Sequence, residues 1–344
     1  MSDLYAQSGV NLTLARKVKA GLPALLRRAT RPGALGKVGA FGGLFRARFP
    51  GRRDPVLVAS MDGVGTKLRV AIEMGRHDTV GQDLVNHCCN DIAVMGAEPL
   101  FFLDYLGTGK LKPAVFREIL AGIAAACAAA RVALLGGETA QMPGIYREGD
   151  YDLVGTIVGV VDRAAILDGS KIRPGDAIYG VESTGLHTNG FSLARDVLFR
   201  RMKLDARARP RALGGATLGE VLLRVHRNYS PFLAALRRTG ARLHGAAHIT
   251  GGGFEENLER ILPARCAAEI RRGAWPTPPI FDLIRAGGRV SDAEMHRVFN
   301  MGIGLALFAT PSEAARLERV ARRFGFRVFR IGATVAGRRA VRFV

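Results

Sequence analysis

Four short glycine-bearing segments, each directly after an apolar run, limit what this chain can fold into. They are Asp62-Gly63-Val64-Gly65-Thr66-Lys67, Gly136-Gly137-Glu138-Thr139, Thr184 to Gly190 (TGLHTNG) and Thr250-Gly251-Gly252-Gly253-Phe254. The apolar runs read as strands, and ligands of α/β proteins bind at the loops that follow strands. Asp62, Lys67, Glu138 and His187 are also side chains of the kinds that bind metal or phosphate. The pattern predicts a folded enzyme that acts on phosphorylated ligands.

The length and the patterning predict two domains of the α/β class, of the α+β type. A chain of 344 residues exceeds the size at which a single hydrophobic core usually keeps growing. Strand and helix patterns are mixed in both halves. The clearest break is the turn-rich, charged segment DGSKIRPGD from Asp168 to Asp176. We therefore predict domains over residues 1–168 and 169–344.

The charge of the chain does not predict a nucleic-acid partner. The formal net charge is +20, but only eight of the 50 Lys and Arg residues are Lys, which indicates a compositional bias towards Arg. The Arg residues are scattered, without a basic tract and without the aromatic ladder on which single strands stack. We expect no nucleic-acid partner, and the positive charge suits anionic metabolites.

Neither a membrane span nor a secretory signal is predicted. The sequence has no uninterrupted run of 18 apolar residues, and its first residues, MSDLYAQSGVNLTLARK, contain no apolar core. The four cysteines, Cys88, Cys89, Cys127 and Cys266, form no CxxC pair. Buried thiols in a reducing compartment fit this pattern, so we expect a cytoplasmic protein with no membrane partner.

Apolar residues recur at helical spacing from Val80 to Met95, and the opposite stripe of this segment holds Asp83, His87, Asn90 and Asp91. Further helices are predicted over Lys112–Ala130, Phe191–Met202, 217–226, 230–238, from Gly251–Gly253 onward and over Ser312–Arg323. Strands are predicted over Pro55–Ala59, Leu100–Leu106, Val132–Leu135, Asp152–Val161, Ala177–Val181, Gly302–Ala309 and Arg327–Ile331.

The DGVGTK segment combines three features of a nucleotide-phosphate site. Gly63 and Gly65 let the backbone approach phosphate, Asp62 offers a carboxylate for Mg²⁺, and Lys67 offers an ammonium beside Thr66. The spacing is not that of a Walker loop, which needs GxxxxGK[ST]. An ordinary tight turn with surface charges explains the residues equally well.

Asn90 and Asp91 follow on the polar stripe of the predicted helix. Asp91 is a candidate second Mg²⁺ ligand, because Mg²⁺ takes oxygen ligands and usually one or two carboxylates together with substrate phosphates. A solvated helix face accounts for the same stripe without a ligand. His87 on this stripe is expected to be structural or exposed rather than a ligand.

The GGET segment places Glu138 beyond Gly136 and Gly137 at the end of a predicted strand, where ligands of α/β sheets bind, with Thr139 next to it. A surface carboxylate in a turn is the alternative. We expect a loop at this position.

The two later segments offer an acid–base group and an anion cradle. TGLHTNG combines His187, Asn189 and Gly190, and an imidazole can donate to phosphate or transfer a proton near neutral pH. Gly251, Gly252 and Gly253 open a helix whose backbone N–H groups suit phosphate. The alternatives are a loop held by Asn and Thr side chains and a helix start stabilised by the two following glutamates.

The whole chain resembles the phosphoribosylformylglycinamidine cyclo-ligases, or aminoimidazole ribonucleotide (AIR) synthetases, of purine biosynthesis. The matching motifs run in the order of that family: Tyr5 with Ser8-Gly9-Val10, Gly39 to Gly43, DGVGTKLR from Asp62, HDTVGQDLV from His77, Asn90-Asp91, GAEPLFFLDYLGTGKL from Gly96, GGETAQMPGIY from Gly136, DYDLVGTIVGVVDR from Asp150, DGSKIRPGD from Asp168, HTNGFSLAR from His187, HITGGGFEENLERILP from His248 and EMHRVFNMGIGLAL from Glu294. The combination is far more specific than any single loop.

The resemblance implies an activity, cofactors and an assembly. The family uses ATP and Mg²⁺ to close formylglycinamidine ribonucleotide into aminoimidazole ribonucleotide, with release of ADP and phosphate, through a phosphorylated amide. It also implies an AIR-synthetase-like fold of two α/β domains, with mixed sheets flanked by helices. The first domain would bind nucleotide and form a homodimer in which the first-domain sheets of two subunits join.

The resemblance also implies residue roles. Asp62, Asp91 and Glu138 match acidic positions suited to Mg²⁺–ATP, and His187, Asp62, Lys67 and Asp91 are the candidate catalytic residues. The nucleotide-binding candidates are Gly63, Gly65, Thr66, Lys67, Asn90, Gly136, Gly137, Thr139, Asn189, Gly190, Gly251, Gly252 and Gly253. We expect His187 to contact the transferred phosphate or the amide oxygen.

Three residues depart from the family pattern. Met61 stands where the family has Thr, Gln141 where it has Glu, and Asn11 where it has Asp, so a hydroxyl and two carboxylates are missing. These departures keep two alternatives open. One is another ATP-using enzyme of the superfamily, of the selenophosphate synthetase, thiamine-phosphate kinase or hydrogenase maturation type. The other is a non-catalytic nucleotide-binding relative.

Overall fold

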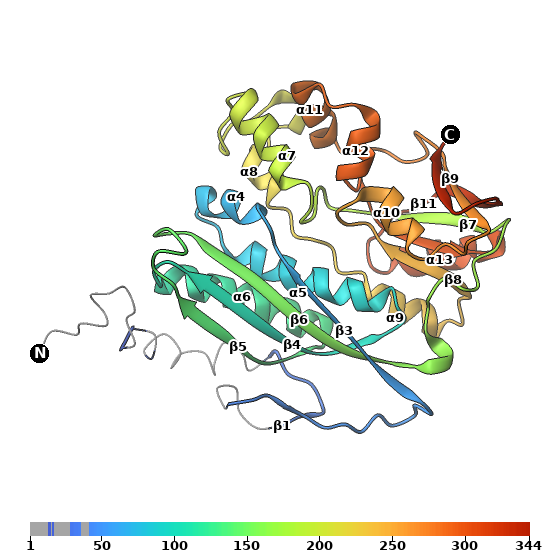
Figure 1. The fold of residues 1–344 in the computed structure, drawn as a ribbon, viewed down its shortest axis with the longest axis horizontal. Coiled ribbons are helices and arrows are strands. Elements are labelled where there is room, and N and C mark those ends of the chain that lie inside the picture. Colours follow the sequence, from blue (N-terminus) through green and yellow to red (C-terminus); the bar gives the residue numbers. More distant parts are fainter. Residues whose placement is uncertain (1–12, 15, 17–27, 36–40) are drawn as a thin grey trace, which may run out of the picture. The chain divides into compact units, whose positions relative to one another are not determined.

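The computed structural model describes residues 13, 14, 16, 28–35 and 41–344 (Figure 1). Asn11 and most of the motifs near the start therefore lie outside the described residues. The chain forms two compact units, Met1–Ile92 with Glu98–Arg163, and Ala93–Ala97 with Ala164–Val344. The first unit ends at Arg163, whereas the domain boundary predicted after Asp168 stays a prediction.

The first unit is built on a mixed four-stranded sheet in the order β3 (Pro55–Gly63), β6 (Tyr151–Asp162), β4 (Glu98–Thr108) and β5 (Ala133–Gln141). Strands β4 and β5 are parallel, and the other two pairs are antiparallel. A short antiparallel pair, β1 (Ala34–Leu35) and β2 (Leu44–Phe45), precedes the sheet. The helices are α4 (Lys67–Met74), α5 (Asp78–Ala93) and α6 (Pro113–Ala130).

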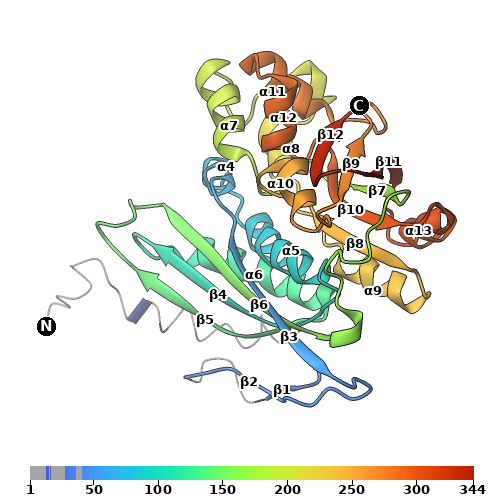
Figure 2. The ribbon, with the colours of Figure 1, turned by 45° about the vertical axis from the view of Figure 1, so that its right-hand side comes forward.

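Helices α5 and α6 cover one face of this sheet (Figure 2). A Cβ on Gly155 of β6 would lie 3.0 Å from Leu84 of α5, which identifies the face that α5 covers. The two helix backbones approach so closely that a Cβ on Gly81 would lie 2.2 Å from the Ile119 carbonyl oxygen. Helix α6 is long and apolar enough to cross a membrane by length and composition alone, but here Phe116, Ile119 and other residues of one stripe are buried in the core.

The other face of this sheet is apolar and exposed. Alternate residues of β3 point away from the helices, and Leu57 and Met61 are 61% and 68% exposed. Met61 and Leu103 lie in one row across the sheet, because both pair with Thr156 of β6. Met61, where a threonine was expected, therefore adds to an apolar surface.

The second unit contains a six-stranded sheet in the order β12 (Ala340–Phe343), β9 (Cys266–Ile270), β11 (Val328–Ala336), β7 (Ala177–Glu182), β10 (Ile303–Ala309) and β8 (Leu243–His248). Only the β12–β9 pair is parallel. Its helices include α7 (Phe191–Arg195), α8 (Leu218–Leu222), α9 (Ser230–Arg238), α10 (Gly253–Glu259), α11 (Pro279–Gly288), α12 (Asp292–Val298) and α13 (Ala314–Arg322). One core packs Phe232 and Leu236 of α9 and Leu317 of α13 against Leu305 and Leu307 of β10.

Most predicted elements are present, and the mixed α/β class with helix-flanked sheets is confirmed. The expected GGET loop is wrong, because Gly136 to Thr139 lie inside β5, where they pair with β4. The helix predicted over Phe191–Met202 divides into α7 and a π-helical turn, Asp196–Arg201. The helix predicted over 217–226 ends at Leu222. The patterns missed α4, α11, α12, β1, β2, β9 and β12.

Candidate functional site

In the first unit, strand β3 and helix α5 bring Asp62, His87 and Asp91 together. His87 Nε2 lies 2.9 Å from Asp62 Oδ2 and 3.8 Å from Asp91 Oδ2. The Gly63 backbone N–H donates to Asp62 Oδ1 at 2.7 Å, and the Ser60 hydroxyl donates to Asp91 Oδ2 at 3.2 Å. His87, which was expected to be structural or exposed, is buried, and its ring lies beside both candidate metal ligands.

The charges of this cluster stabilise one another. Burial alone would raise the pKa of Asp62, but the hydrogen bond and the charge of His87 outweigh burial and lower that pKa. Burial likewise opposes the charged form of His87, but its hydrogen bond to Asp62 and the charges of Asp91, Asp62 and Asp83 raise the pKa of His87 above its usual value. The Asp62 and Asp91 carboxylates are oxygen ligands of the kind that divalent cations take.

Lys67 does not present its ammonium to solvent. It is the first residue of α4, and its Nζ lies 2.7 Å from Asp83 Oδ2, with both side chains 0% exposed. Lys and Asp are almost never fully buried unless they are paired. The geometry gives Lys67 a partner inside the protein, which sequence reasoning did not foresee although Asp83 was placed on the polar stripe of the same helix as Asp91.

The remainder of DGVGTK forms the turn from β3 into α4. Gly63 ends the strand, Gly65 has a left-handed φ of +68°, and Thr66 precedes the first helical residue. Asn90 on α5 is fully buried. The structure thus places Gly63, Gly65 and Thr66 at the end of β3, which carries Asp62, and Asn90 on α5, which carries Asp91.

Glu138 lies apart from that cluster within the chain. One row of paired residues across the four strands consists of Asp62, Gly155, Asp104 and Gly137. Glu138 lies in the next row, so its side chain points from the opposite face of the sheet to that of Asp62. Three strand spacings of about 4.8 Å also separate β3 from β5. Glu138 is exposed and accepts a hydrogen bond from the Thr139 backbone N–H at 2.6 Å. Within a single chain, Glu138 therefore does not lie in the same site as Asp62 and Asp91.

Asp104 is a half-buried carboxyl that sequence reasoning did not single out. It lies opposite Gly137, where a Cβ would come within 2.4 Å of Asp104 Oδ1. Burial raises the pKa of Asp104 to about 7. An acidic residue inside the apolar run FFLDYL was the signal available in the sequence.

The raised pKa of Asp104 predicts a pH-dependent stability. Because the folded-state pKa lies above that of the unfolded chain, the native state binds more protons between about pH 4 and pH 7, and stability falls as pH rises through this range. Asp104→Asn is expected to raise the thermal midpoint at pH 8 and to leave it nearly unchanged at pH 4. Thermal unfolding followed by circular dichroism checks this, and equal shifts at both pH values would contradict it.

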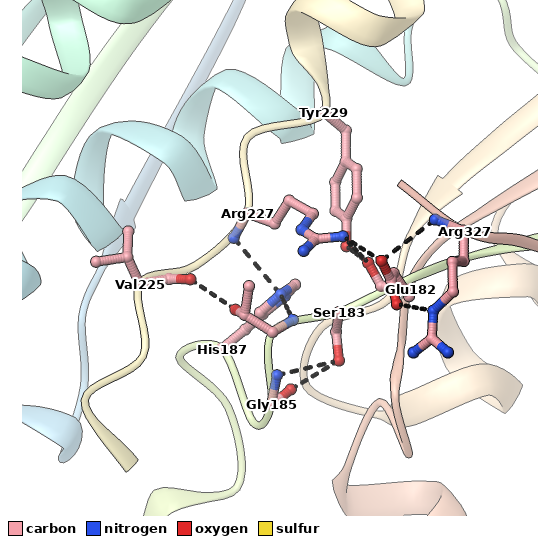
Figure 3. Close-up of polar contacts among 9 residues, drawn as sticks. Glu182, Ser183, Gly185, His187, Val225, Arg227, Tyr229 and Arg327 are labelled. Carbon is pink, nitrogen blue, oxygen red and sulfur yellow. Dashed lines mark hydrogen bonds and ion pairs between the residues drawn. The ribbon is translucent and has the colours of Figure 1, made fainter. Parts of the chain in front are cut away.

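In the second unit, the TGLHTNG segment folds around His187 (Figure 3). His187 Nε2 accepts hydrogen bonds from the backbone N–H groups of Thr184 at 3.2 Å and Arg227 at 3.5 Å. The Thr184 hydroxyl donates to the Val225 carbonyl oxygen at 2.6 Å. His187 is buried and has a left-handed φ of +61°. These contacts give the imidazole a role in holding the loop, in addition to any role toward a ligand.

A chain of polar groups continues from this loop. Thr188 Oγ1 lies 3.2 Å from His226 Nδ1, and His226 Nε2 lies 2.9 Å from His248 Nε2. The rings of His187 and His226 are stacked, with centroids 4.0 Å apart and planes 20° apart. Ring nitrogens of all three histidines lie within 4.8 Å of one another. Each ring's lone pair lies in its own plane, and the His187 and His226 planes are nearly parallel and 4.0 Å apart between centroids, so the two rings do not point at a shared ion.

The structure brings the TGLHTNG and TGGGF segments side by side. A Cβ on Gly251 would lie 3.4 Å from Asn189 Oδ1. Gly253 has a φ of +58°, and a Cβ there would lie 1.8 Å from the His296 carbonyl oxygen. Gly190 is equally constrained, since a Cβ would lie 2.2 Å from the Phe299 ring. Gly190 and Gly253 are therefore required by the fold, whether or not they also bind phosphate, whereas the contact at Gly251 is an ordinary van der Waals one.

Removal of the His187 ring tests how much the ring contributes to folding stability. His187→Ala is expected to lower the free energy of unfolding by about 1–3 kcal/mol, because two backbone N–H groups lose their acceptor. His187→Asn should recover part of the loss, since Asn keeps an oxygen acceptor and tolerates a left-handed φ. Urea denaturation measures both values. Wild-type stability in the alanine variant would show that the hydrogen bonds of the ring do not hold the loop.

Similarity to known proteins covers both units. Residues 47–161 match the N-terminal domain model of AIR synthase related proteins, and residues 173–344 match the C-terminal domain model. A phosphoribosylformylglycinamidine cyclo-ligase of Symbiobacterium thermophilum is 49% identical over 96% of this chain and 95% of its own length. One of Bifidobacterium animalis subsp. lactis is 43% identical over 97% of both chains.

Solved structures share the fold at low identity. Thiamine-monophosphate kinase of Stenotrophomonas maltophilia aligns with a TM-score of 0.69 at 20% identity, covering 97% of this chain and 96% of the kinase. The hydrogenase maturation protein HypE in complex with ATP aligns with a TM-score of 0.63 at 17% identity, covering 93% of this chain and 86% of HypE.

Proposed function

Because this chain belongs to the AIR synthase related family, we propose that it is a phosphoribosylformylglycinamidine cyclo-ligase that acts in purine biosynthesis. The observation that carries the proposal is 49% identity to such an enzyme over nearly the full length of both chains. The reaction closes formylglycinamidine ribonucleotide into aminoimidazole ribonucleotide and releases ADP and phosphate. The likeness to the kinase and to HypE concerns the fold alone. We place the reaction in the cytoplasm.

The chemistry requires an activated amide oxygen. ATP supplies the phosphoryl group that makes this oxygen a leaving group. A substrate nitrogen then attacks the amide carbon that bears this oxygen, and the oxygen leaves as phosphate. Phosphoryl transfer depends mainly on positioning and on neutralisation of negative charge. Asp62 and Asp91 fit a divalent cation such as Mg²⁺, since both carboxylates lie beside His87 and each has a neighbouring group that fixes one of its oxygens.

The other candidate residues act through backbone and polar contacts. We assign the phosphates of ATP or substrate to the glycine turns, because their backbone can approach an anion closely. The turn residues are Gly63, Gly65 and Thr66 in the first unit, and His187, Asn189, Gly190, Gly251, Gly252 and Gly253 in the second. The further candidates are Gly136, Gly137 and Thr139 in β5 and Asn90 on α5. Lys67 acts as a positioning residue that fixes the start of α4, because its ammonium is paired with Asp83.

We also propose a homodimer formed through the exposed face of the first-unit sheet. Leu57, Met61 and Leu103 make this face apolar, and exposed apolar patches mark interaction surfaces. A second copy of this chain is the occupant, since the resemblance implies that first-domain sheets join. Glu138 leaves the sheet on this same face, so the dimer would bring it toward the partner subunit.

Charged residues on that face are expected to dissociate the dimer. The double substitution Leu57→Lys and Met61→Lys buries like charges across a symmetric interface and should convert a dimer into monomers at micromolar concentration. Light scattering coupled to size exclusion measures the mass. Ile145→Lys is the matched control, because Ile145 is 73% exposed but lies outside the sheet. A dimer that survives the double substitution would place the interface elsewhere.

The function is tested by turnover. Purified protein with formylglycinamidine ribonucleotide, ATP and Mg²⁺ should form aminoimidazole ribonucleotide and ADP in equal amounts. Thiamine monophosphate in place of the ribonucleotide should give no product. ATP binding without ring closure would instead favour the non-catalytic relative.

A further inference from the structure

Glu182, the last residue of β7, is a charged residue that the proposed function leaves unused. Its side chain is only 15% exposed, and its two oxygens accept from Arg227 Nη1 at 3.0 Å and from Arg327 Nε at 2.7 Å (Figure 3). Burial alone would raise the pKa of Glu182, but the hydrogen bonds from Arg327 and Arg227 outweigh burial and lower that pKa. A charged carboxylate is therefore held just before the TGLHTNG segment.

Arg227 links this carboxylate to His187. Its guanidinium pairs with Glu182 and lies over the Phe326 ring, 4.7 Å from the ring centroid. Its backbone N–H donates to His187 Nε2 at 3.5 Å. The Tyr229 hydroxyl adds a second tie to the same strand end, because it donates to the Glu182 carbonyl oxygen at 2.8 Å. The side chain of Arg227 thus fixes the backbone group that contacts the imidazole.

The two backbone contacts of His187 determine where its ring proton lies. Backbone N–H groups can only donate, and Nε2 accepts from those of Thr184 at 3.2 Å and Arg227 at 3.5 Å. Nε2 therefore carries its lone pair, and the proton of the neutral ring is on Nδ1. A proton on Nε2 would point at both amide hydrogens. While Nε2 accepts these two hydrogen bonds, it takes no proton from a substrate.

We propose that Glu182 is a positioning residue for the TGLHTNG segment, and that through Arg227 it holds His187 as the Nδ1–H tautomer. The ring in turn holds the backbone of the segment. This inference rests on the proposed function, which assigns phosphate to that backbone. No proton is transferred in this role, because the ring only accepts hydrogen bonds at Nε2. A misplacement of about 1 Å at a reacting group can slow a reaction by about 10²-fold.

The first test is the ¹⁵N spectrum of the full-length protein, labelled at histidine and without ligands, at slightly alkaline pH. Ring nitrogens with and without a proton resonate in separate ranges. We expect a proton on His187 Nδ1 and none on Nε2, and the signals of this ring are identified by their loss in His187→Asn. A proton on His187 Nε2 in the wild type would overturn the inference, whether or not any variant folds.

Two substitutions break the link from opposite ends. Glu182→Ala removes the carboxylate, and Arg227→Met removes the guanidinium but keeps the backbone N–H. Each should give His187 a mixture of tautomers and lower kcat by about 10–100-fold, with little change in KM for ATP. Because both act on one link, the double variant should lose no more than the more impaired single variant. Glu182→Gln keeps an acceptor oxygen and should recover part of kcat.

Arg327→Met is the matched control. Arg327 binds the other oxygen of the same carboxylate, and its side chain is 65% exposed. This variant should keep the tautomer and nearly the kcat of the wild type. A loss as large as that in Arg227→Met would overturn the inference, because the carboxylate would then act through the sheet and not through Arg227. An unchanged tautomer and kcat in folded Arg227→Met would also overturn it.

Failure of the inference and failure of the function are distinguishable, because the spectrum is measured without substrate. A protein that closes the ring of its substrate but carries the His187 proton on Nε2 leaves the cyclo-ligase assignment intact and removes the role of Glu182. A protein that shows the Nδ1–H tautomer and its change in Arg227→Met, but does not close the ring, supports the link and removes the assigned reaction.

Discussion

Replacing Asp62 with asparagine is expected to slow ring closure by about 10²–10⁴-fold. A cation that neutralises phosphoryl charge is worth several kcal/mol, and each 1.36 kcal/mol of barrier is about tenfold in rate. Asparagine keeps the shape and an oxygen but removes the negative charge beside His87. Steady-state turnover with saturating ATP measures the effect, and a thermal melt of the same sample shows whether the variant is folded.

The control for Asp62 lies on the helix that carries Asp91. Asp78→Asn removes a carboxylate from the first turn of α5, where Asp78 pairs with Arg76 at 3.2 Å, and should leave the rate within about twofold of wild type. Unchanged turnover in Asp62→Asn would remove Asp62 from the site.

Lys67→Met is expected to cost about 3–5 kcal/mol of folding stability, because it leaves the Asp83 carboxylate buried without its counter-charge. Replacing both partners, as Lys67→Met with Asp83→Leu, should recover most of the loss, since apolar residues of similar size are often tolerated in place of a buried pair. Chemical denaturation of the two single variants and the double variant gives the coupling energy.

Lys110→Met provides the comparison for Lys67. Lys110 pairs with Glu148 at 3.1 Å, but both side chains are more than 60% exposed. Exposed pairs contribute about 0–1 kcal/mol, so this variant should be nearly as stable as wild type. A Lys67→Met protein of wild-type stability but without activity would instead indicate that Lys67 binds the phosphates.

Most strands and three of the four glycine turns were predictable because they depend on local pattern. Apolar runs, helical spacing around Val80 to Met95 and the glycine segments gave most element positions, and their order gave the family. Register was not local. The face on which Glu138 emerges depends on how β5 pairs with β4, and a shift of one residue would reverse it. The sequence alone does not say which residues of β4 and β5 pair, so it does not determine the face on which Glu138 lies.

The partners of charged residues were also beyond the sequence. Lys67 reads as a solvent-exposed lysine in a glycine turn, and only tertiary packing puts it against Asp83. His87 reads as one polar position on a helix, and only the end of β3 gives it Asp62. His226 carried no motif at all, yet it links Thr188 to His248. These contacts join segments far apart in the chain, where spacing rules do not reach.

The short piece Ala93–Ala97 has a consequence for how the protein is made. It belongs to the second unit, where Ala93 joins the core, Met95 accepts a hydrogen bond from the Leu167 N–H at 3.0 Å and Gly96 accepts one from the Arg237 guanidinium. The ribosome releases this piece before most of the first-unit sheet and long before β7. The second unit therefore completes its core with a segment whose two ends continue into α5 and β4 of the first unit, both of which are synthesised before β7. A gene cut at any single position leaves one of the units without part of its chain, so the two halves cannot be exchanged as independent cassettes.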